Sequence, residues 1–230
     1  MHVHFQAVVF DLDGTLLDTL ADIANSANSA LARYGFPPRG ADEYRYFVGE
    51  GVTVLISRAL PAEKRNDDII SDCVKAFRES YSLNWNVNTK PYDGVMELLD
   101  ELTSKQVKMT ILSNKPDNFT KRCVRELLPY KRFEMVLGQR EGIPMKPDPA
   151  GALEIAETLG IASSQFLYLG DSGLDMQTAT RAGMFPVGAA WGFRSEEELR
   201  THGAQVVVEQ PRDLLDILDN PSSSFISPET

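Results

Sequence analysis

Short, continuous apolar runs alternate with amphipathic segments along most of this chain. The first run is Ala7-Val8-Val9-Phe10, and later runs cover residues 108–112, 135–137, 166–169, 185–187 and 205–208. Continuous apolar residues are typical of strands that are buried on both faces of a parallel sheet. Segments with apolar residues three and four positions apart, which indicate helices, separate these runs. The sequence therefore predicts an α/β fold built on a doubly wound parallel sheet.

One long segment departs from this alternation. Between residues 17 and 88 the apolar periodicity is helical and no strand pattern interrupts it. Helices are expected near residues 20–34, 42–46, 52–59 and 69–81. We therefore predict an inserted all-helical domain at residues 17–88 and an α/β core formed by residues 1–16 and 89–230. The polar C-terminal residues 221–230 are expected to be loosely ordered.

The charge balance limits the possible partners. The 230 residues include 23 Lys and Arg against 33 Asp and Glu, which gives a formal net charge of −10. This acid excess argues against binding to nucleic acid and against docking on an anionic membrane. No apolar run approaches the length of about 18 residues that a membrane span needs, and the N-terminal sequence does not resemble a signal peptide. Cys73 and Cys123 form no disulfide framework, so a soluble cytoplasmic protein is expected.

Four sets of polar residues lie at or near the ends of predicted strands. They are Asp11, Asp13, Gly14 and Thr15; Ser113, Asn114 and Lys115; Lys146; and Gly170, Asp171, Ser172 and Asp175. The ligands of an open parallel sheet bind at the carboxyl ends of its strands. We therefore expect the four sets to form one site.

The residue types in these sets point to a particular chemistry. Asp11 and Asp13 point the same way on an extended segment, because side chains alternate with period two. Clustered carboxylates repel one another, and a hard cation such as Mg²⁺ relieves that repulsion. With Asp171 and Asp175 included, Mg²⁺ and Lys146 would reduce the local charge of the four carboxylates to about −1. A carboxylate nucleophile, a metal ion, a lysine and the neutral donors Ser113 and Asn114 together indicate phosphoryl transfer.

Each set taken alone has a simpler explanation. The Asp-x-Asp-Gly-Thr stretch can form a turn or a helix cap, and Ser113 or Asn114 can cap a helix that starts at Pro116. A lysine beside prolines, such as Lys146, is usually solvated. The joint order of the four sets, each near a strand end, favours one site over these separate alternatives.

In these residues the chain resembles the haloacid dehalogenase superfamily, in its phosphatase branch with a helical cap. The resemblance rests on DLDGTLLDT at residues 11–19, Ser113-Asn114, Lys146-Pro147 and GDSGLDM at residues 170–176. It extends over nearly the whole chain, from about residue 8 to residue 218. It implies a Rossmann-like core, with the inserted helical domain acting as a cap.

The resemblance also implies roles for the acidic residues. Asp11 would be the nucleophile that becomes an aspartyl phosphate, and Asp13 would protonate the leaving alcohol and then activate the hydrolytic water. Mg²⁺ would be held by the side chains of Asp11 and Asp171 and by the backbone carbonyl of Asp13. Asp175 and Ser172 would not contact the substrate; they would hold the metal ion or Lys146 in place.

Further residues are implied to hold the substrate. The phosphoryl group would be bound by Ser113, Asn114, Lys146 and the backbone amides from Leu12 to Gly14. Residues 47–51 and 190–194 look like the corresponding segments of phosphoglycolate phosphatases, and amides near Gly49 would face the substrate unless the segment is only a turn between helices. Arg45 is a candidate partner for a substrate carboxylate, the alternative being a solvated arginine. Trp191 and Phe193 are expected to be packing residues.

Two functions remain open within this resemblance. The expected function is Mg²⁺-dependent hydrolysis of a small phosphate monoester, with 2-phosphoglycolate as the best candidate, by a monomer or homodimer. The alternative is a sugar-phosphate mutase that resembles β-phosphoglucomutase. A phosphonate-cleaving enzyme is disfavoured because residues 14–62 contain no lysine that could form a Schiff base. A phospho-signalling receiver module is disfavoured because it has no helical insertion after its first strand.

Overall fold

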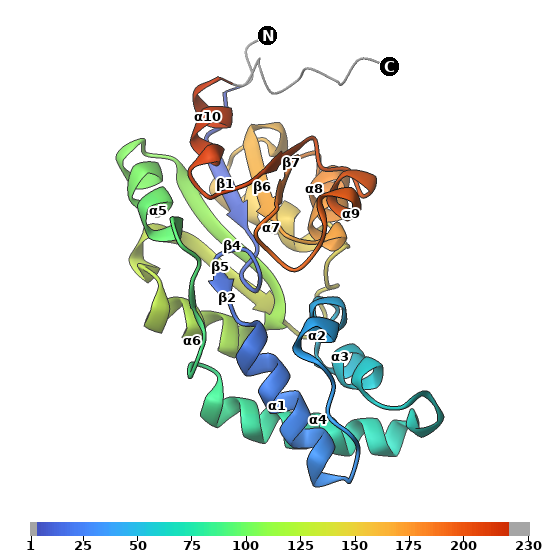
Figure 1. Cartoon of the computed structure of the whole chain (residues 1–230). Helices are drawn as coiled ribbons and strands as arrows, with labels where there is room; N and C mark the ends of the chain where they lie inside the picture. The colour runs from blue at the N-terminus through green and yellow to red at the C-terminus, as the bar shows by residue number, and fades with distance from the viewer. Residues whose placement is uncertain (1–3, 221–230) are drawn as a thin grey trace. The chain divides into compact units, whose positions relative to one another are not determined.

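The computed structural model describes residues 4–220 of the chain. These residues form two compact units (Figure 1). The sheet unit contains the described residues up to Leu16 and those from Pro91 onward, and the helical unit is Leu17–Lys90. Residues 221–230, which were expected to be loosely ordered, lie outside the described part of the chain.

A six-stranded sheet forms the centre of the sheet unit, in the order β5-β4-β1-β6-β7-β8. All five pairs of neighbouring strands in this sheet run parallel. The strands are β1 (Ala7–Phe10), β4 (Lys108–Pro116), β5 (Phe133–Gln139), β6 (Phe166–Gly170), β7 (Phe185–Ala189) and β8 (Val206–Val208). All four residues of β1 are fully buried, as a continuous apolar run requires. The predicted doubly wound α/β fold is confirmed.

Helices alternate with the strands of this sheet along the chain. They are α5 (Val95–Ser104), α6 (Asp117–Leu127), α7 (Ala150–Leu159), α8 (Gly173–Ala182), α9 (Glu196–Thr201) and α10 (Asp213–Asp219). On one face of the sheet, Val9 of β1 belongs to a buried cluster with Ile155 of α7 and Ala179 of α8. The neighbouring residue Val8 is equally buried and points to the opposite face, because strand side chains alternate. Both faces of β1 are therefore covered.

The strand order places a ligand site beside β1. From β1 the chain moves outward to β4 and β5, then crosses to β6 and moves outward in the other direction to β7 and β8. The topological switch point therefore lies between the neighbouring strands β1 and β6. Open α/β sheets bind ligands at this point, at the carboxyl ends of their strands. Asp11 directly follows β1, and Asp171 directly follows β6.

Strand β4 is longer than the sequence predicts. The apolar run ends at Leu112, but the strand continues to Pro116, with a register shift against β5 between Leu112 and Pro116. The prediction that Ser113 and Lys115 follow the strand is therefore wrong, since they lie within its last residues. The last residues of the strand are polar, so an analysis of apolar runs does not detect them. The irregular register changes the direction of the side chains there, as β-bulges next to active sites do.

The helical unit consists of four α-helices and a short turn of 3₁₀-helix. They are α1 (Leu20–Arg33), α2 (Ala41–Phe47), α3 (Val52–Ala59), η1 (Ala62–Lys64) and α4 (Asp67–Asn84). Helix α1 packs against α4, with Leu31 and Phe77 buried on the apolar faces of the two helices. The connecting strands β2 (Leu17–Asp18) and β3 (Lys90–Pro91) pair with each other. The sequence did not predict this pair, because two residues carry no periodicity.

A buried carboxylate joins the start of α1 to the end of the helical unit. Asp22 is 2% exposed and accepts hydrogen bonds from the backbone N–H groups of Asn88 and Thr89, at 2.9 and 2.8 Å. The side chains of the same two residues donate to it at 2.7 and 2.8 Å. Burial raises the pKa of Asp22, but these hydrogen bonds outweigh burial and hold the pKa below its ordinary value. The ionised form of Asp22 therefore stabilises the helical unit.

Asp22→Asn should lower the free energy of unfolding of the helical unit by about 2 kcal/mol at pH 7, because the bonds to a charged acceptor are lost. A carboxyl with a lowered folded-state pKa contributes stability above its unfolded pKa of about 4 and loses it as the pH falls through the folded value. The difference between wild type and variant should therefore shrink as the pH falls below about 4.

Tryptophan fluorescence gives a measurement specific to this unit, because Trp85 and Trp191 lie in different units. Urea unfolding followed through Trp85, in a Trp191→Phe background, should show the loss for Asp22→Asn. Asp42→Asn is the matched control, since Asp42 lies fully exposed in the first turn of α2 and should change stability by less than about 0.5 kcal/mol. Equal stabilities of wild type and Asp22→Asn at pH 7 would contradict the role of Asp22.

Within residues 4–220, the structure contains no helix that combines the length and the apolar character needed to cross a membrane. The two cysteines, Cys73 and Cys123, are buried free thiols in different units. A disulfide between them is therefore not part of this structure.

Candidate active site

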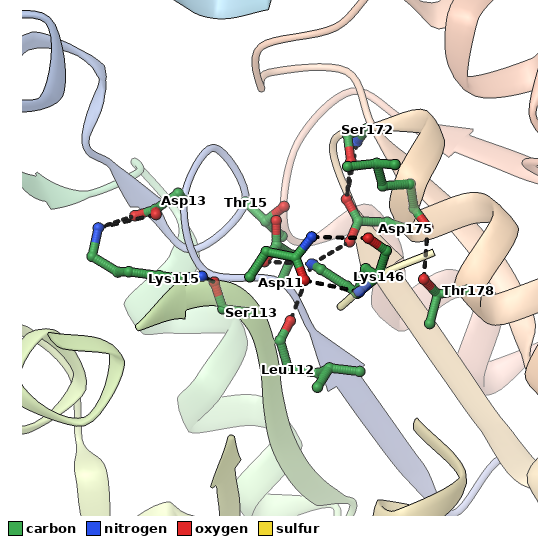
Figure 2. A network of polar contacts seen from close by, with 12 residues as sticks. Asp11, Asp13, Thr15, Leu112, Ser113, Lys115, Lys146, Ser172, Asp175 and Thr178 are labelled. Atoms are coloured by element: carbon green, nitrogen blue, oxygen red, sulfur yellow. Dashed lines mark hydrogen bonds and ion pairs between the residues drawn. The ribbon is translucent and has the colours of Figure 1, made fainter. Parts of the chain in front are cut away.

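Asp11 lies at the carboxyl end of β1 and faces a buried lysine (Figure 2). Its backbone N–H continues the sheet by donating to the carbonyl of Leu169 at 2.9 Å, which fixes the start of the loop. The ammonium group of Lys146 lies 2.8 Å from Oδ1 of Asp11. Burial raises the pKa of Asp11 well above its ordinary value; Lys146 opposes the shift, and Asp175 and Asp171 add to it.

Asp175 and Ser172 begin helix α8 and hold Lys146 from the other side. Oδ1 of Asp175 lies 2.6 Å from the Lys146 ammonium, and Oδ2 accepts hydrogen bonds from the Ser172 hydroxyl at 2.6 Å and backbone N–H at 3.1 Å. This is a capping box, in which a residue three positions into the helix bonds back to the cap residue. Both carboxylate oxygens of Asp175 are therefore engaged within the protein.

Asp171 follows β6 and is held by two donors. Its Oδ1 accepts from the Thr15 hydroxyl at 3.1 Å, and its Oδ2 accepts from the backbone N–H of Phe193 at 2.8 Å. A Cβ atom on Gly192 would lie 2.2 Å from Cβ of Asp171, so only glycine lets this turn approach the carboxylate. The indole N–H of Trp191 donates to the Thr15 carbonyl at 3.0 Å and ties the same turn to the loop after β1.

Gly14 brings the loop after β1 against the same carboxylate. Its φ is +88°, in the region that favours glycine, and a Cβ atom there would lie 2.2 Å from Oδ2 of Asp171. The loop therefore passes close to Asp171 only because residue 14 has no side chain.

The three buried carboxylates carry more negative charge than the adjacent lysine balances. Oxygen atoms of Asp11, Asp171 and Asp175 all lie within 4.8 Å of one another. Burial, followed by the charge of Asp175, raises the pKa of Asp171 to about 7. A hard divalent cation would remove this electrostatic cost, and an all-oxygen donor set is the one that Mg²⁺ prefers. The residues present therefore fit a Mg²⁺ ion. Each oxygen of Asp171 accepts a single hydrogen bond, whereas Asp175 accepts two at Oδ2 and contacts the Lys146 ammonium at Oδ1, so Asp11 and Asp171 keep more capacity to bind the ion than Asp175.

Asp13 contacts a second buried lysine rather than this cluster. The ammonium group of Lys115 lies 3.0 Å from both carboxylate oxygens of Asp13. In Figure 2 this pair lies apart from the group formed by Asp11, Lys146 and Asp175. The sequence analysis placed Lys115 in the polar set after the predicted strand but assigned no role to it.

Ser113 and Asn114, the expected phosphate ligands, are both buried beside Lys146 and Lys115. The Asn114 amide binds the backbone of Lys146: Nδ2 donates to its carbonyl at 3.0 Å, and Oδ1 accepts from its N–H at 2.9 Å. Ser113 Oγ accepts from the Lys115 N–H at 3.3 Å. In this structure Asn114 therefore positions the segment that carries Lys146, and direct binding of phosphate by either side chain stays a prediction. Leu12, expected to offer its amide, is fully buried in the same loop.

The two expected substrate residues of the helical unit lie at and just after α2. The Arg45 guanidinium is 3.8 Å from the carboxylate of Asp42, one turn earlier. Gly49, with φ of +126°, and Gly51, with φ of +84°, form the turn between α2 and α3. Arg58 of α3 donates to the Tyr46 carbonyl at 3.2 Å and so supports that turn. The roles of Arg45 and Gly49 toward a substrate stay predictions.

Three contacts of the site were not predicted from the sequence. Thr15 and Lys115 were placed at the site without a partner, and Phe193 was expected only to pack. The Thr15 hydroxyl, the Phe193 amide and the Lys115 ammonium each bind a site carboxylate. A backbone amide leaves no signal in residue type. The close Asp11-x-Asp13 pairing could have suggested a second buried cation, because paired carboxylates need compensation.

Comparisons with known proteins show which family this chain is similar to. A family model described as haloacid dehalogenase-like hydrolase matches residues 8–189. Phosphoglycolate phosphatase 1 of Pseudomonas aeruginosa is 32% identical over 216 residues, which are 92% of this chain and 79% of that protein. The N-acetylmuramic acid 6-phosphate phosphatase of the same organism is 29% identical over 94% of this chain and 96% of its own length.

A solved structure extends the similarity to the three-dimensional fold. A protein of Lactobacillus delbrueckii subsp. bulgaricus, provisionally named phosphoglycolate phosphatase, superposes with a TM-score of 0.87 at 30% identity. The match covers 94% of this chain and 98% of the Lactobacillus chain, so both units are included.

Proposed function

Because the chain belongs to the haloacid dehalogenase-like hydrolase family, we propose that it is a Mg²⁺-dependent phosphatase of small phosphate monoesters, with 2-phosphoglycolate as its substrate. The observation that carries this proposal is the buried cluster in which Lys146 contacts Asp11, and the carboxylates of Asp11 and Asp171 lie within 4.8 Å. A nucleophile, a cation and a metal-binding pair of carboxylates are the groups that phosphoryl transfer needs.

In the first step, a carboxylate oxygen of Asp11 attacks phosphorus. The bond between phosphorus and the ester oxygen breaks, and Asp13 gives a proton to the departing alkoxide. Lys146 stabilises the negative charge of the transferring phosphoryl group, and the amides from Leu12 to Gly14 donate to its oxygens. The product is an aspartyl phosphate at Asp11.

In the second step, water attacks the phosphorus of this acyl phosphate. The Asp13 carboxylate takes the proton from the water, the bond between phosphorus and the Asp11 oxygen breaks, and inorganic phosphate forms. Asp13 regains the proton that it gave to the alcohol, so the enzyme returns to its starting state. Splitting one slow hydrolysis into two steps is the general advantage of covalent catalysis.

Mg²⁺ would be held by the side chains of Asp11 and Asp171 and by the backbone carbonyl of Asp13. When bound, the ion offsets the charge of phosphate and carboxylate and orients them. Thr15 and Phe193 keep Asp171 in a fixed orientation, while Asp175 and Ser172 hold Lys146. Ligands that are already held in place bind a metal with less loss of conformational freedom.

The helical unit, residues 17–88 in the sequence prediction and Leu17–Lys90 in the structure, acts as a cap that sets substrate choice. Amides near Gly49 and the guanidinium of Arg45 recognise the part of the substrate beyond the phosphate. An arginine suits the carboxylate of 2-phosphoglycolate, because the two pair as opposite charges. The free thiols Cys73 and Cys123 suit a reducing compartment, the cytoplasm, where the enzyme works as a monomer or homodimer.

The comparisons suggest a second substrate, and the residues leave open a second reaction. A relative that is named for N-acetylmuramic acid 6-phosphate makes a larger sugar phosphate the second candidate. The mutase alternative uses the same aspartyl phosphate but returns the phosphoryl group to a sugar. The relatives described above are named as phosphatases, which favours hydrolysis.

The test is phosphate release from a panel of phosphorylated metabolites, with Mg²⁺ and with EDTA. We expect the highest kcat/KM for 2-phosphoglycolate and loss of turnover in EDTA that is restored by added Mg²⁺. Because Mg²⁺ neutralises buried carboxylates, substrate affinity should fall together with turnover when the ion is removed. Equal turnover in EDTA would contradict the Mg²⁺ proposal. An isomerised hexose phosphate, in place of free sugar and phosphate, would instead support the mutase.

A further inference from the structure

The ion pair of Asp13 with Lys115 is not explained by the fold alone. Both side chains are nearly buried: 13% of the Asp13 side chain and 5% of the Lys115 side chain are exposed to solvent. Surface ion pairs contribute little, but two buried charges need one another, since removing either leaves the other uncompensated. Removing both charges from water costs free energy. An ion pair that carries this cost at a reaction site is expected to have a role in the reaction.

The backbone of Lys115 is held on both sides. Its N–H donates to Ser113 Oγ at 3.3 Å, and its carbonyl accepts from the Thr120 hydroxyl at 3.0 Å. It lies in the irregular end of β4, where the register against β5 shifts. The ammonium group therefore projects from a fixed point of the sheet.

The contact also restrains the orientation of the carboxylate. One ammonium group at 3.0 Å from both oxygens favours a single plane and direction for the Asp13 carboxylate. An unrestrained aspartate would rotate about two side-chain bonds, and proton transfer requires the donor within hydrogen-bond reach of the reacting oxygen. Orientation of this kind can account for a large part of a catalytic effect.

Building on the proposed function, we infer that Lys115 is the positioning residue for Asp13. It keeps the Asp13 carboxylate directed for its two proton transfers, to the leaving alkoxide in the first step and from water in the second. Lys115 does not itself contact the phosphoryl group in this assignment. Lys146 serves the nucleophile and Lys115 serves the acid–base residue, so each buried lysine has one catalytic aspartate.

The leaving group separates this role from a purely structural one. Nitrophenolate departs from p-nitrophenyl phosphate without a proton, whereas the alkoxide of 2-phosphoglycolate needs one. Loss of Asp13 positioning should therefore spare the first step for p-nitrophenyl phosphate and slow it for 2-phosphoglycolate. The second step should slow for both substrates, because water must lose a proton in each case.

The experiment compares wild type, Lys115→Met and Lys108→Met by rapid mixing and steady-state assays with Mg²⁺. Lys108 is the matched control, because it lies on the same strand and also pairs with a carboxylate, Glu134, at 2.5 Å in an exposed position. For Lys115→Met with p-nitrophenyl phosphate we expect a burst of about one nitrophenolate per site. Its kcat should fall about tenfold to a hundredfold, and KM should change by less than about twofold.

With 2-phosphoglycolate the same variant should lose more of its kcat and show no burst of alcohol release. Lys115→Gln, whose amide can still donate to one oxygen of Asp13, should recover part of the activity. Lys108→Met should match wild type throughout. Circular dichroism and the thermal midpoint identify any variant that fails to fold. If Lys115→Met does not fold, the kinetics of Lys115→Gln are compared with those of wild type instead.

Three results would overturn the inference while wild type remains active. One is a kcat for Lys115→Met within about twofold of wild type. Another is an equal loss for both substrates without a burst, which is the pattern of general damage. The third is a raised KM with unchanged kcat, which would make Lys115 a substrate ligand. Absence of hydrolysis by wild type would instead reject the proposed function, and this inference with it.

Discussion

Asp11→Asn should reduce phosphate release from 2-phosphoglycolate by about 10⁴-fold or more, because an amide cannot form the covalent intermediate. The substitution keeps the size of the side chain and removes only its nucleophilic oxygen. Substrate binding should persist, since Lys146 and the loop amides remain. The loss should therefore appear in kcat rather than in KM.

The same variant should not lose stability. Burial raises the pKa of Asp11, so in the folded protein its ionised form is disfavoured. Such a carboxyl lowers stability as the pH rises above its unfolded pKa of about 4, and asparagine removes that cost. In EDTA at pH 7 we expect the thermal midpoint of Asp11→Asn to equal or exceed that of wild type. A large decrease would mean that the residue is needed for folding, and the loss of activity would then say little about catalysis.

Asp100→Asn is the control for both measurements, because Asp100 is an exposed carboxylate of α5 that pairs with Arg132. It should keep the activity of wild type. Near wild-type hydrolysis by Asp11→Asn would reject Asp11 as the nucleophile.

The second large effect is expected for Lys146→Met. The variant leaves Asp11 and Asp175 buried without the ammonium group that lies 2.8 and 2.6 Å from them. Removing one partner of a buried ion pair costs about 3–5 kcal/mol of folding free energy. Activity should fall by about 10³-fold, because the charge on the transferring phosphoryl group loses its stabilising cation.

Urea unfolding in EDTA at pH 7 measures the first of these effects. The loss of folding free energy should be smaller at pH 5. The pKa of Asp11 is raised, so its carboxyl takes up a proton as the pH falls and its unpaired negative charge disappears. Lys105→Met is the control, because Lys105 pairs with Asp219 at a more exposed position, and it should cost less than about 1 kcal/mol. An equal cost for the two variants would show that Lys146 is not an essential counter-charge.

The architecture was largely predictable, because buried parallel strands leave a strong pattern. The run from Ala7 to Phe10 is apolar without interruption, and the structure buries it between two neighbouring strands. The end of β4 was not predictable in this way. Ser113 and Lys115 continue the strand with polar side chains, since they face a site rather than a core.

The site was predictable where residue type carries the chemistry. Asp11 and Asp171 meet because each directly follows a strand on the same edge of one sheet. Lys146 reaches them from the loop between β5 and α7, whose backbone binds Asn114 of β4. Contacts made by the backbone, such as the Phe193 amide on Asp171, depend on loop conformation and leave no signal in the sequence. Asn114 illustrates the same limit, because its residue type fits a phosphate ligand while its amide binds the backbone of Lys146.

Direct trapping of the phosphorylated enzyme tests the central proposal of covalent catalysis at Asp11. Wild-type protein is mixed with Mg²⁺ and substrate, quenched in acid during turnover and digested, and the peptides are weighed by mass spectrometry. The peptide that contains Asp11 should carry one added phosphoryl group, and borohydride reduction of the acyl phosphate should convert Asp11 to homoserine. The Asp11→Asn variant should show neither change. An active wild type with the label on another residue, or with no label on the Asp11 peptide at any time during turnover, would contradict the mechanism.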